Sequence, residues 1–197
     1  MRPCKPPHSP TATLTGSGMN DTISALGGND TLTGGAGVDV LIGGAGDDTY
    51  RLGRGAGLDT VMENDATAGN TDVAILLSGV ATDQIWFRRV GYDRDLEASI
   101  LGTSDRFVFQ NWYQADQYHV EQFKTTDGAR TLLDSQVDNL VNAMASFAPP
   151  AAGQTTLPPA YQTALAPVIA ANWLRFDKGI NPFSRYFVFV IIKSNLI

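Results

Sequence analysis

The chain has 197 residues, enough to bury a sizeable core in one or two domains. Its net charge of -6 argues against a nucleic-acid partner, because phosphate binding needs a basic surface. A single cysteine, Cys4, cannot form an internal disulfide.

The first stretch of the chain, residues 1–12, is predicted to be a disordered lead-in because it is rich in proline and poor in apolar residues. It contains no apolar run of the kind that a signal peptide carries, so a route of export without a signal peptide stays open. Leu14 then fills the apolar position of a partial first repeat unit, in which Ala12 stands where an aspartate is expected.

One phrase returns every nine residues between Gly16 and Glu63, with a looser last unit that follows two residues late. The sixth position of each unit is always an aspartate: Asp21, Asp30, Asp39, Asp48 and Asp59. The eighth position is always apolar or aromatic: Ile23, Leu32, Leu41, Tyr50 and Val61. A fixed nine-residue period with these two constants is typical of a calcium-binding parallel β-roll.

Each unit is predicted to be a glycine-rich turn followed by a three-residue strand whose central side chain points inward. Two units make one coil, so units two apart stack at the spacing of ~4.8 Å between neighbouring strands. This predicts Asp21 above Asp39 and Asp30 above Asp48 in two columns. The extra Leu52 and Gly53 make the stacking of Asp59 on Asp39 less regular. The β-roll is expected to span residues 13–65.

The rest of the chain is predicted to form three further segments. Residues 66–133 show the short alternating strands and turns of a small antiparallel β domain, with strands at 73–77, 84–90, 96–101, 106–112 and 119–124. Residues 134–173 show helical periodicity, with a second helix interrupted by Pro167, and residues 174–197 form an atypical tail. The fold class is therefore mainly β, with a parallel β-roll, an antiparallel β domain and a C-terminal helical segment.

The repeat carries the chemistry of a hard cation site. Ca²⁺ prefers six to eight oxygen ligands from carboxylates and backbone carbonyls, and stacked aspartates in glycine-rich turns offer both. Without metal, stacked carboxylates would repel by ~1 kcal/mol per pair at ~4 Å in water, and more where water is excluded. The roll is therefore expected to fold when calcium binds.

These turns resemble the RTX, or haemolysin-type, calcium-binding repeat of secreted Gram-negative proteins, whose GGxGxD phrase occurs twice in succession here, ending at Asp39 and at Asp48. The resemblance implies carbonyl ligands from the first and third positions of a turn, together with the aspartates. It implies the ligand set Asp21, Gly27, Asn29, Asp30, Gly34, Ala36, Asp39, Gly43, Ala45, Asp48 and Asp59. Residues 69–133 similarly look like the β domain that follows such repeats.

The resemblance implies a calcium-binding module that folds outside the cell and supports type I secretion and stability of an RTX protein. The expected partners are calcium ions and a type I secretion apparatus, with no nucleic acid and no transmembrane segment. The protein is expected to be secreted and not an enzyme, because His8 and His119 offer little material for a zinc site or a catalytic triad. The alternatives are the end of an extracellular RTX protease or lipase, or an adhesive surface protein.

Overall fold

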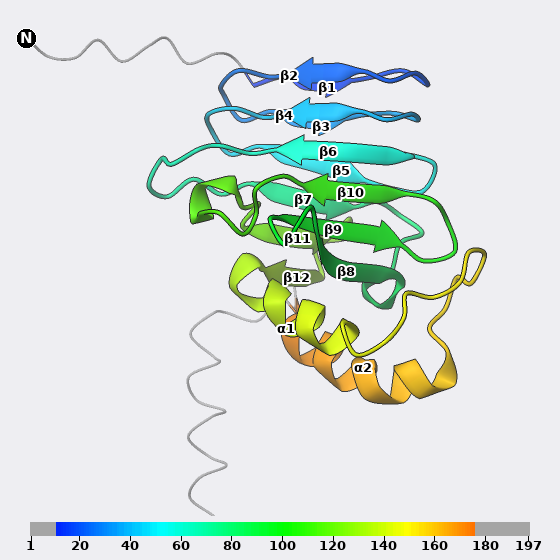
Figure 1. The fold of residues 1–197 in the computed structure, drawn as a ribbon. Coiled ribbons are helices and arrows are strands. Elements are labelled where there is room, and N and C mark those ends of the chain that lie inside the picture. Colours follow the sequence, from blue (N-terminus) through cyan, green and yellow to red (C-terminus); the bar gives the residue numbers. More distant parts are fainter. Residues whose placement is uncertain (1–10, 176–197) are drawn as a thin grey trace, which may run out of the picture.

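Short strands alternate between two sheets in the first part of the chain, as the nine-residue period predicts. The computed structural model describes residues 11–175. One sheet begins with three parallel strands: β1 (Thr13–Thr15), β3 (Thr31–Thr33) and β5 (Thr49–Leu52). The other begins with β2 (Thr22–Ser24), β4 (Val40–Ile42) and β6 (Leu58–Met62), also parallel. Figure 1 shows these coils stacked at the N-terminal end of the molecule.

The eighth-position side chains form the core of this β-roll. Leu32, Leu41 and Tyr50 are fully buried. In β3 and β4, the residues on either side of the central leucine are only partly buried. Since neighbouring side chains of a strand point to opposite faces, one inward residue per three-residue strand fills the space between the sheets. In the first coil, the corresponding Leu14 and Ile23 are partly exposed, so this coil is the less protected end of the roll.

Both sheets continue beyond the roll. The first sheet adds β7 (Val73–Leu76), β11 (Gln122–Thr125), β12 (Arg130–Leu133) and β13 (Leu174–Arg175). The second adds β10 (Arg106–Phe109), β9 (Asp95–Ile100) and β8 (Ile85–Val90). The resulting fold, mainly β with parallel strands in a roll and two C-terminal helices, is the fold class that the sequence predicts.

Most of the later strands pair with one another in antiparallel fashion, as expected of a small antiparallel β domain, but they join the roll through parallel pairs. Antiparallel pairing occurs within β8–β9–β10 and β11–β12–β13. However, β7 pairs in parallel with β5 and β11, and β10 pairs in parallel with β6. The physical reason is that the last strand of each roll sheet has an edge of unpaired N–H and C=O groups, which the next strand satisfies.

Two helices cover the far end of the sheets (Figure 1). Helix α1 (Asp134–Met144) buries Val137, Leu140, Val141 and Met144 and packs on β8, and helix α2 (Pro159–Asn172) packs on α1. The expected interruption at Pro167 is wrong, because α2 runs through this residue. Leu165 and Ile169 are buried on either side of Pro167, and this packing holds the helix together.

Most of the predicted lead-in and tail lie outside the described residues, which begin at Thr11 and end at Arg175. The last two of these residues, Leu174–Arg175, form β13 against β12. Within residues 11–175, neither helix combines the length and the apolar character that a membrane crossing requires.

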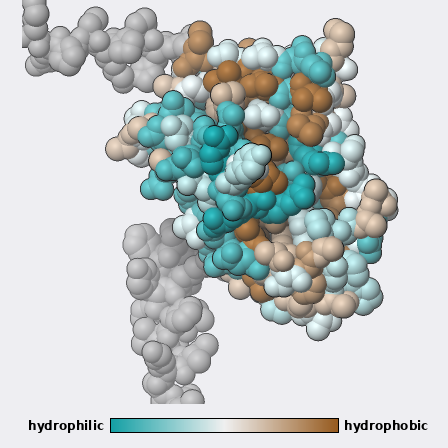
Figure 2. Space-filling view, viewed as in Figure 1, coloured by the Kyte–Doolittle hydropathy of each residue, from teal (hydrophilic) through white to brown (hydrophobic). Residues whose placement is uncertain are grey.

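The first turns of the roll depart from the repeat and expose apolar side chains. Met19 and Leu26 stand at positions that carry glycine in later units, and they are 72% and 77% exposed. Leu26 also adopts a positive φ of 72°, which is costly for a side chain of this size. Figure 2 shows apolar surface over the first coils, at the top of the view. The later turns carry glycine at these two positions, so they avoid both the exposed apolar side chain and the strained backbone.

Gly44→Ala is expected to destabilise the protein by about 3 kcal/mol, because two costs add at this position. Gly44 has a φ of 100°, and a Cβ there would overlap the Leu26 carbonyl oxygen of the coil before. Gly69→Ala is the matched control: its φ is 87°, but a Cβ would meet nothing within 4 Å. Urea unfolding in calcium-saturated buffer measures both, and equal losses of stability would show that close stacking of the turns contributes nothing.

Candidate metal centre

The aspartates of the repeat stand in two columns that are tied together by their own backbones. The sixth-position residues of the first four units directly precede a strand, so the parallel register of the strands places these aspartates one above another. The Asp21 N–H donates to Asp39 Oδ1 at 2.8 Å, and the Asp30 N–H donates to Asp48 Oδ1 at 2.8 Å. The predicted stacking of both pairs is confirmed.

The late fifth unit also joins its column. The Asp39 N–H donates to Asp59 Oδ1 at 3.1 Å, across 20 residues in place of the usual 18. The insertion is absorbed because Leu52 extends β5 by one residue and pairs with Leu76 of β7. Asp59 is therefore a regular member of the column that begins with Asp21.

The second oxygen of each central carboxylate has no partner. Oδ2 of Asp30, Asp39 and Asp48 is buried and receives no hydrogen bond from the described residues. These three residues are at most 1% exposed, so bulk water does not reach their Oδ2 atoms to donate a hydrogen bond. An unsatisfied buried carboxylate oxygen is costly, and a coordinated cation is one of the few groups that removes the cost. The donor set therefore fits a hard divalent cation such as Ca²⁺.

Glycines at the first position of three of the turns bring backbone close to aspartate Oδ2 atoms. A Cβ on Gly34 would overlap Asp39 Oδ2, and a Cβ on Gly43 would overlap Asp48 Oδ2. A Cβ on Gly16 would overlap the Gly34 carbonyl oxygen and lie 2.9 Å from Asp21 Oδ2. The Gly34 carbonyl thus lies near the carboxylate of the turn one coil earlier, which is the pairing of carbonyl and carboxylate that a calcium site needs.

The other predicted ligands are placed less uniformly. Ala36 and Ala45 have exposed side chains in the turns, and the Ala45 carbonyl accepts the Gly28 N–H at 2.8 Å. Gly27 forms a parallel bridge with Ala45, so its backbone lies in the stacked turns. Asn29, in contrast, is exposed, and its side chain exchanges hydrogen bonds with Asp47. The structure therefore does not bring the Asn29 side chain to the aspartate columns.

Burial and neighbouring negative charge raise the pKa of Asp48 and Asp59 in the columns. Burial, with a contribution from the Asp30 charge, raises the pKa of Asp48 to about 6. Burial, with a contribution from Asp39, raises the pKa of Asp59 to about 7. Asp21, at the exposed end, has a lowered pKa because the Ser17 N–H and hydroxyl donate to it. The interior of the columns is thus short of positive charge, whereas their exposed end is satisfied by the protein.

One member of the columns is absent from the sequence-based ligand set. The Asp48 N–H donates to Asp72 Oδ1 at 2.7 Å, across 24 residues, so Asp72 extends the column of Asp30 and Asp48. The nine-residue register misses it because the loop between β6 and β7 is longer than a turn of the repeat. The available signal is local: Asp72 follows a Gly-Asn-Thr turn and precedes Val73, as Asp48 precedes Thr49.

Stacked glycine-rich turns, two columns of buried carboxylates and unpartnered Oδ2 atoms together define a calcium-binding parallel β-roll. Comparison with protein families agrees with this class. Residues 15–50 match the RTX calcium-binding nonapeptide repeat (4 copies), and residues 95–130 match the haemolysin-type calcium binding protein related domain. The chain therefore carries RTX calcium-binding repeats followed by a haemolysin-type calcium-binding related domain.

Asp39→Asn is expected to remove about two bound calcium ions, and Asp21→Asn about one. Asp39 has an aspartate on each side of it in its column, Asp21 and Asp59, whereas Asp21 stands at the N-terminal end and has only Asp39 beside it. Equilibrium dialysis of the full chain counts the bound ions. Asp47→Asn is the control, because Asp47 is exposed and outside the columns and loses the same charge. Equal losses in the first two variants would contradict ligands shared between neighbouring sites.

Proposed function

We propose that this protein is a calcium-triggered folding module, which leaves the cell unfolded through a type I secretion apparatus and folds outside. The observation that carries the proposal is the set of buried, unpartnered Oδ2 atoms of Asp30, Asp39 and Asp48. A folded roll without metal must bury these acceptors unsatisfied, so cation binding and folding are expected to occur together.

The difference in calcium between the two sides of the cell envelope supplies the trigger. Extracellular calcium modules have dissociation constants of roughly 10⁻⁴ to 10⁻³ M, far weaker than sites that fill at cytosolic calcium concentrations. The first coil adds to this switch, because Leu14 and Ile23 are only partly buried and contribute little stability of their own. The repeats then stay unfolded in the cytoplasm, as export requires, and fold into a stable roll in the medium.

The role we propose is not enzymatic. His119 stacks on Trp112 with ring centroids 4.2 Å apart. Its Nε2 lies 2.8 Å from the Trp112 carbonyl oxygen, and its Nδ1 lies 3.2 Å from Asp134 Oδ2. Both ring nitrogens are thus engaged in contacts between β-domain and helix residues, which supports a packing role for His119 over a role as a general base.

Export is tested by expressing the full chain in a Gram-negative host with and without a type I secretion apparatus. The expected result is protein in the medium only with the apparatus, and it should be resistant to protease only when calcium is present there. Equal amounts in the medium in both hosts would contradict the proposed route. Peptidase and esterase assays on the calcium-loaded protein are expected to show no activity. Measurable activity would favour the alternative that the chain belongs to an RTX enzyme.

A further inference from the structure

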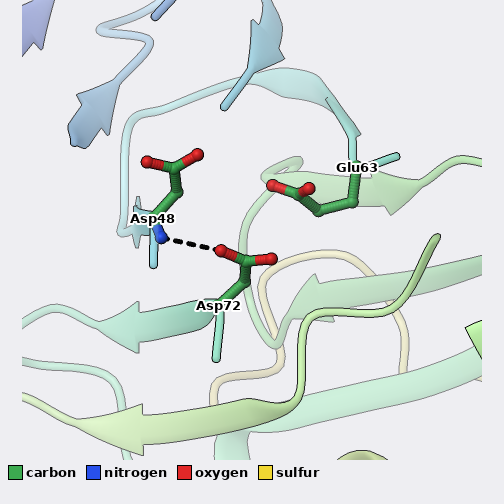
Figure 3. A group of neighbouring side chains, drawn as sticks. All are labelled: Asp48, Glu63 and Asp72. Atoms are coloured by element: carbon green, nitrogen blue, oxygen red, sulfur yellow. Dashed lines mark hydrogen bonds between the residues drawn. The ribbon is translucent and has the colours of Figure 1, made fainter. Parts of the chain in front are cut away.

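Three acidic side chains meet where the last regular repeat adjoins the rest of the protein. We call Asp48, Glu63 and Asp72 the junction cluster; they come from the turn before β5, the residue after β6 and the turn before β7. All three are at most 3% exposed, and one oxygen of each lies within 4.8 Å of the others. Figure 3 shows the Glu63 carboxylate reaching toward the two aspartates.

The donors that the described residues offer to this negative charge are all neutral. Glu63 accepts hydrogen bonds from the Tyr50 hydroxyl and, at 3.2 Å, from the Asn64 N–H. Asp72 accepts the Asp48 N–H and, at 2.7 Å, the Asn70 side-chain amide. Among the described residues, no salt bridge reaches the cluster. Buried carboxylates without a cationic partner are strongly unfavourable, so the cluster is short of positive charge.

A separate observation points to a ligand at this place. Asp48 is fully buried, and its Oδ2 has no hydrogen-bond partner. A Cβ on Gly43 would overlap this Oδ2 and the Tyr50 hydroxyl oxygen, and would lie 2.8 Å from Glu63 Oε1. These three oxygens therefore surround one point, and the unpartnered Oδ2 is aimed into the cluster. Asn70 Oδ1, on the residue that holds Asp72, is likewise buried and unpartnered.

We propose that the junction cluster binds one divalent cation of the calcium class, in addition to the ions of the repeats. The proposal rests on the proposed calcium-dependent folding and extends it to residues outside the repeat. Oxygens within 4.8 Å of one another suit a cation with metal–oxygen distances of about 2.3 to 2.6 Å. Three carboxylates supply the charge. Only Asp48 belongs to the nine-residue phrase.

Such an ion would join the β-roll to the domain that follows it. Asp72 directly precedes β7, which pairs with β5 of the roll on one side and with β11 on the other. The Asp72 N–H donates to Glu121 Oε2 at 2.5 Å, and Glu121 directly precedes β11. A cation held by Asp48 and Asp72 thus links consecutive strands of one sheet, and calcium binding at this point stabilises both parts together.

The test counts calcium ions bound to the full chain in Glu63→Gln, which keeps the acceptor for the Tyr50 hydroxyl but removes the charge. We expect one ion fewer than in the wild type and no loss in Asp83→Asn, which removes one charge from an exposed residue of the segment before β8. An unchanged count in Glu63→Gln overturns the junction site while leaving the repeat sites standing. A wild-type chain that binds a single ion, lost in Glu63→Gln, supports the junction site and contradicts the repeats. A wild-type chain that binds none overturns both.

A second measurement reports where the ion is bound as well as how much is bound. Tb³⁺ takes the same hard oxygen ligands, and emission excited through a nearby aromatic ring reports its proximity. Because the Tyr50 hydroxyl contacts Glu63, an ion in the junction cluster is expected to be excited through the Tyr50 ring. Glu63→Gln should therefore reduce both the amount of bound Tb³⁺ and its aromatic-excited emission, whereas Asp83→Asn should change neither. If Glu63→Gln left both the bound Tb³⁺ and its aromatic-excited emission unchanged, the proposal would be contradicted.

Discussion

Calcium at roughly 10⁻⁴ to 10⁻³ M is expected to convert the chain from a partly unfolded to a folded state, with a gain of β-structure by circular dichroism. The reason is the burial of unpartnered Oδ2 atoms at Asp30, Asp39 and Asp48, which a coordinated cation would satisfy. Each site that binds only the folded state adds about 2.7 kcal/mol at a calcium concentration 100 times its dissociation constant. Several sites together should therefore dominate the stability of the chain.

The same titration with Mg²⁺ is the control for ionic strength and charge. Magnesium demands near-octahedral geometry and gives up its water reluctantly, so it should produce a much smaller change at equal concentration. Thermal unfolding should likewise shift upward with calcium concentration and not with magnesium. Spectra that are identical in chelator and in millimolar calcium would contradict folding coupled to calcium.

The metal-free protein is expected to be more stable at pH 5 than at pH 8. Burial raises the pKa of Asp59 and Asp72 to about 7 and that of Glu63 to about 8, from ordinary values of 3.8 and 4.5. Between the ordinary and the raised values, the folded state binds more protons than the unfolded state. The free energy of unfolding therefore falls as pH rises from about 4 to about 8. The lowered pKa of Asp21 acts below this window.

Urea unfolding in chelator at pH 5, 6, 7 and 8 measures this dependence. In saturating calcium the fall should disappear, because the bound cation replaces the protons on the carboxylates. Glu63→Gln should flatten the upper part of the metal-free profile, since Glu63 has the highest of the three pKa values. A midpoint that rises steadily from pH 5 to pH 8 in chelator would show that these carboxylates are not the groups that limit stability.

The repeat could be predicted from the sequence because each of its properties is local. A glycine at a positive φ, an aspartate at the sixth position and one inward side chain at the eighth are all set within nine residues. The period then determines the stacking, which is why the contacts of Asp21 with Asp39 and of Asp30 with Asp48 were predictable. The helix at 134–144 was predictable for the same reason, from the spacing of its apolar residues.

The sequence by itself thus determined the roll, its register and its two carboxylate columns, because a repeated local pattern has one regular way to stack. Only the tertiary structure decided where the columns end. Asp72 joins across 24 residues and Glu63 enters from just after β6, and no periodicity relates either position to the repeat. Likewise, β7 and β10 add to the roll in parallel because the open sheet edges bind them, a long-range event that local propensity does not encode.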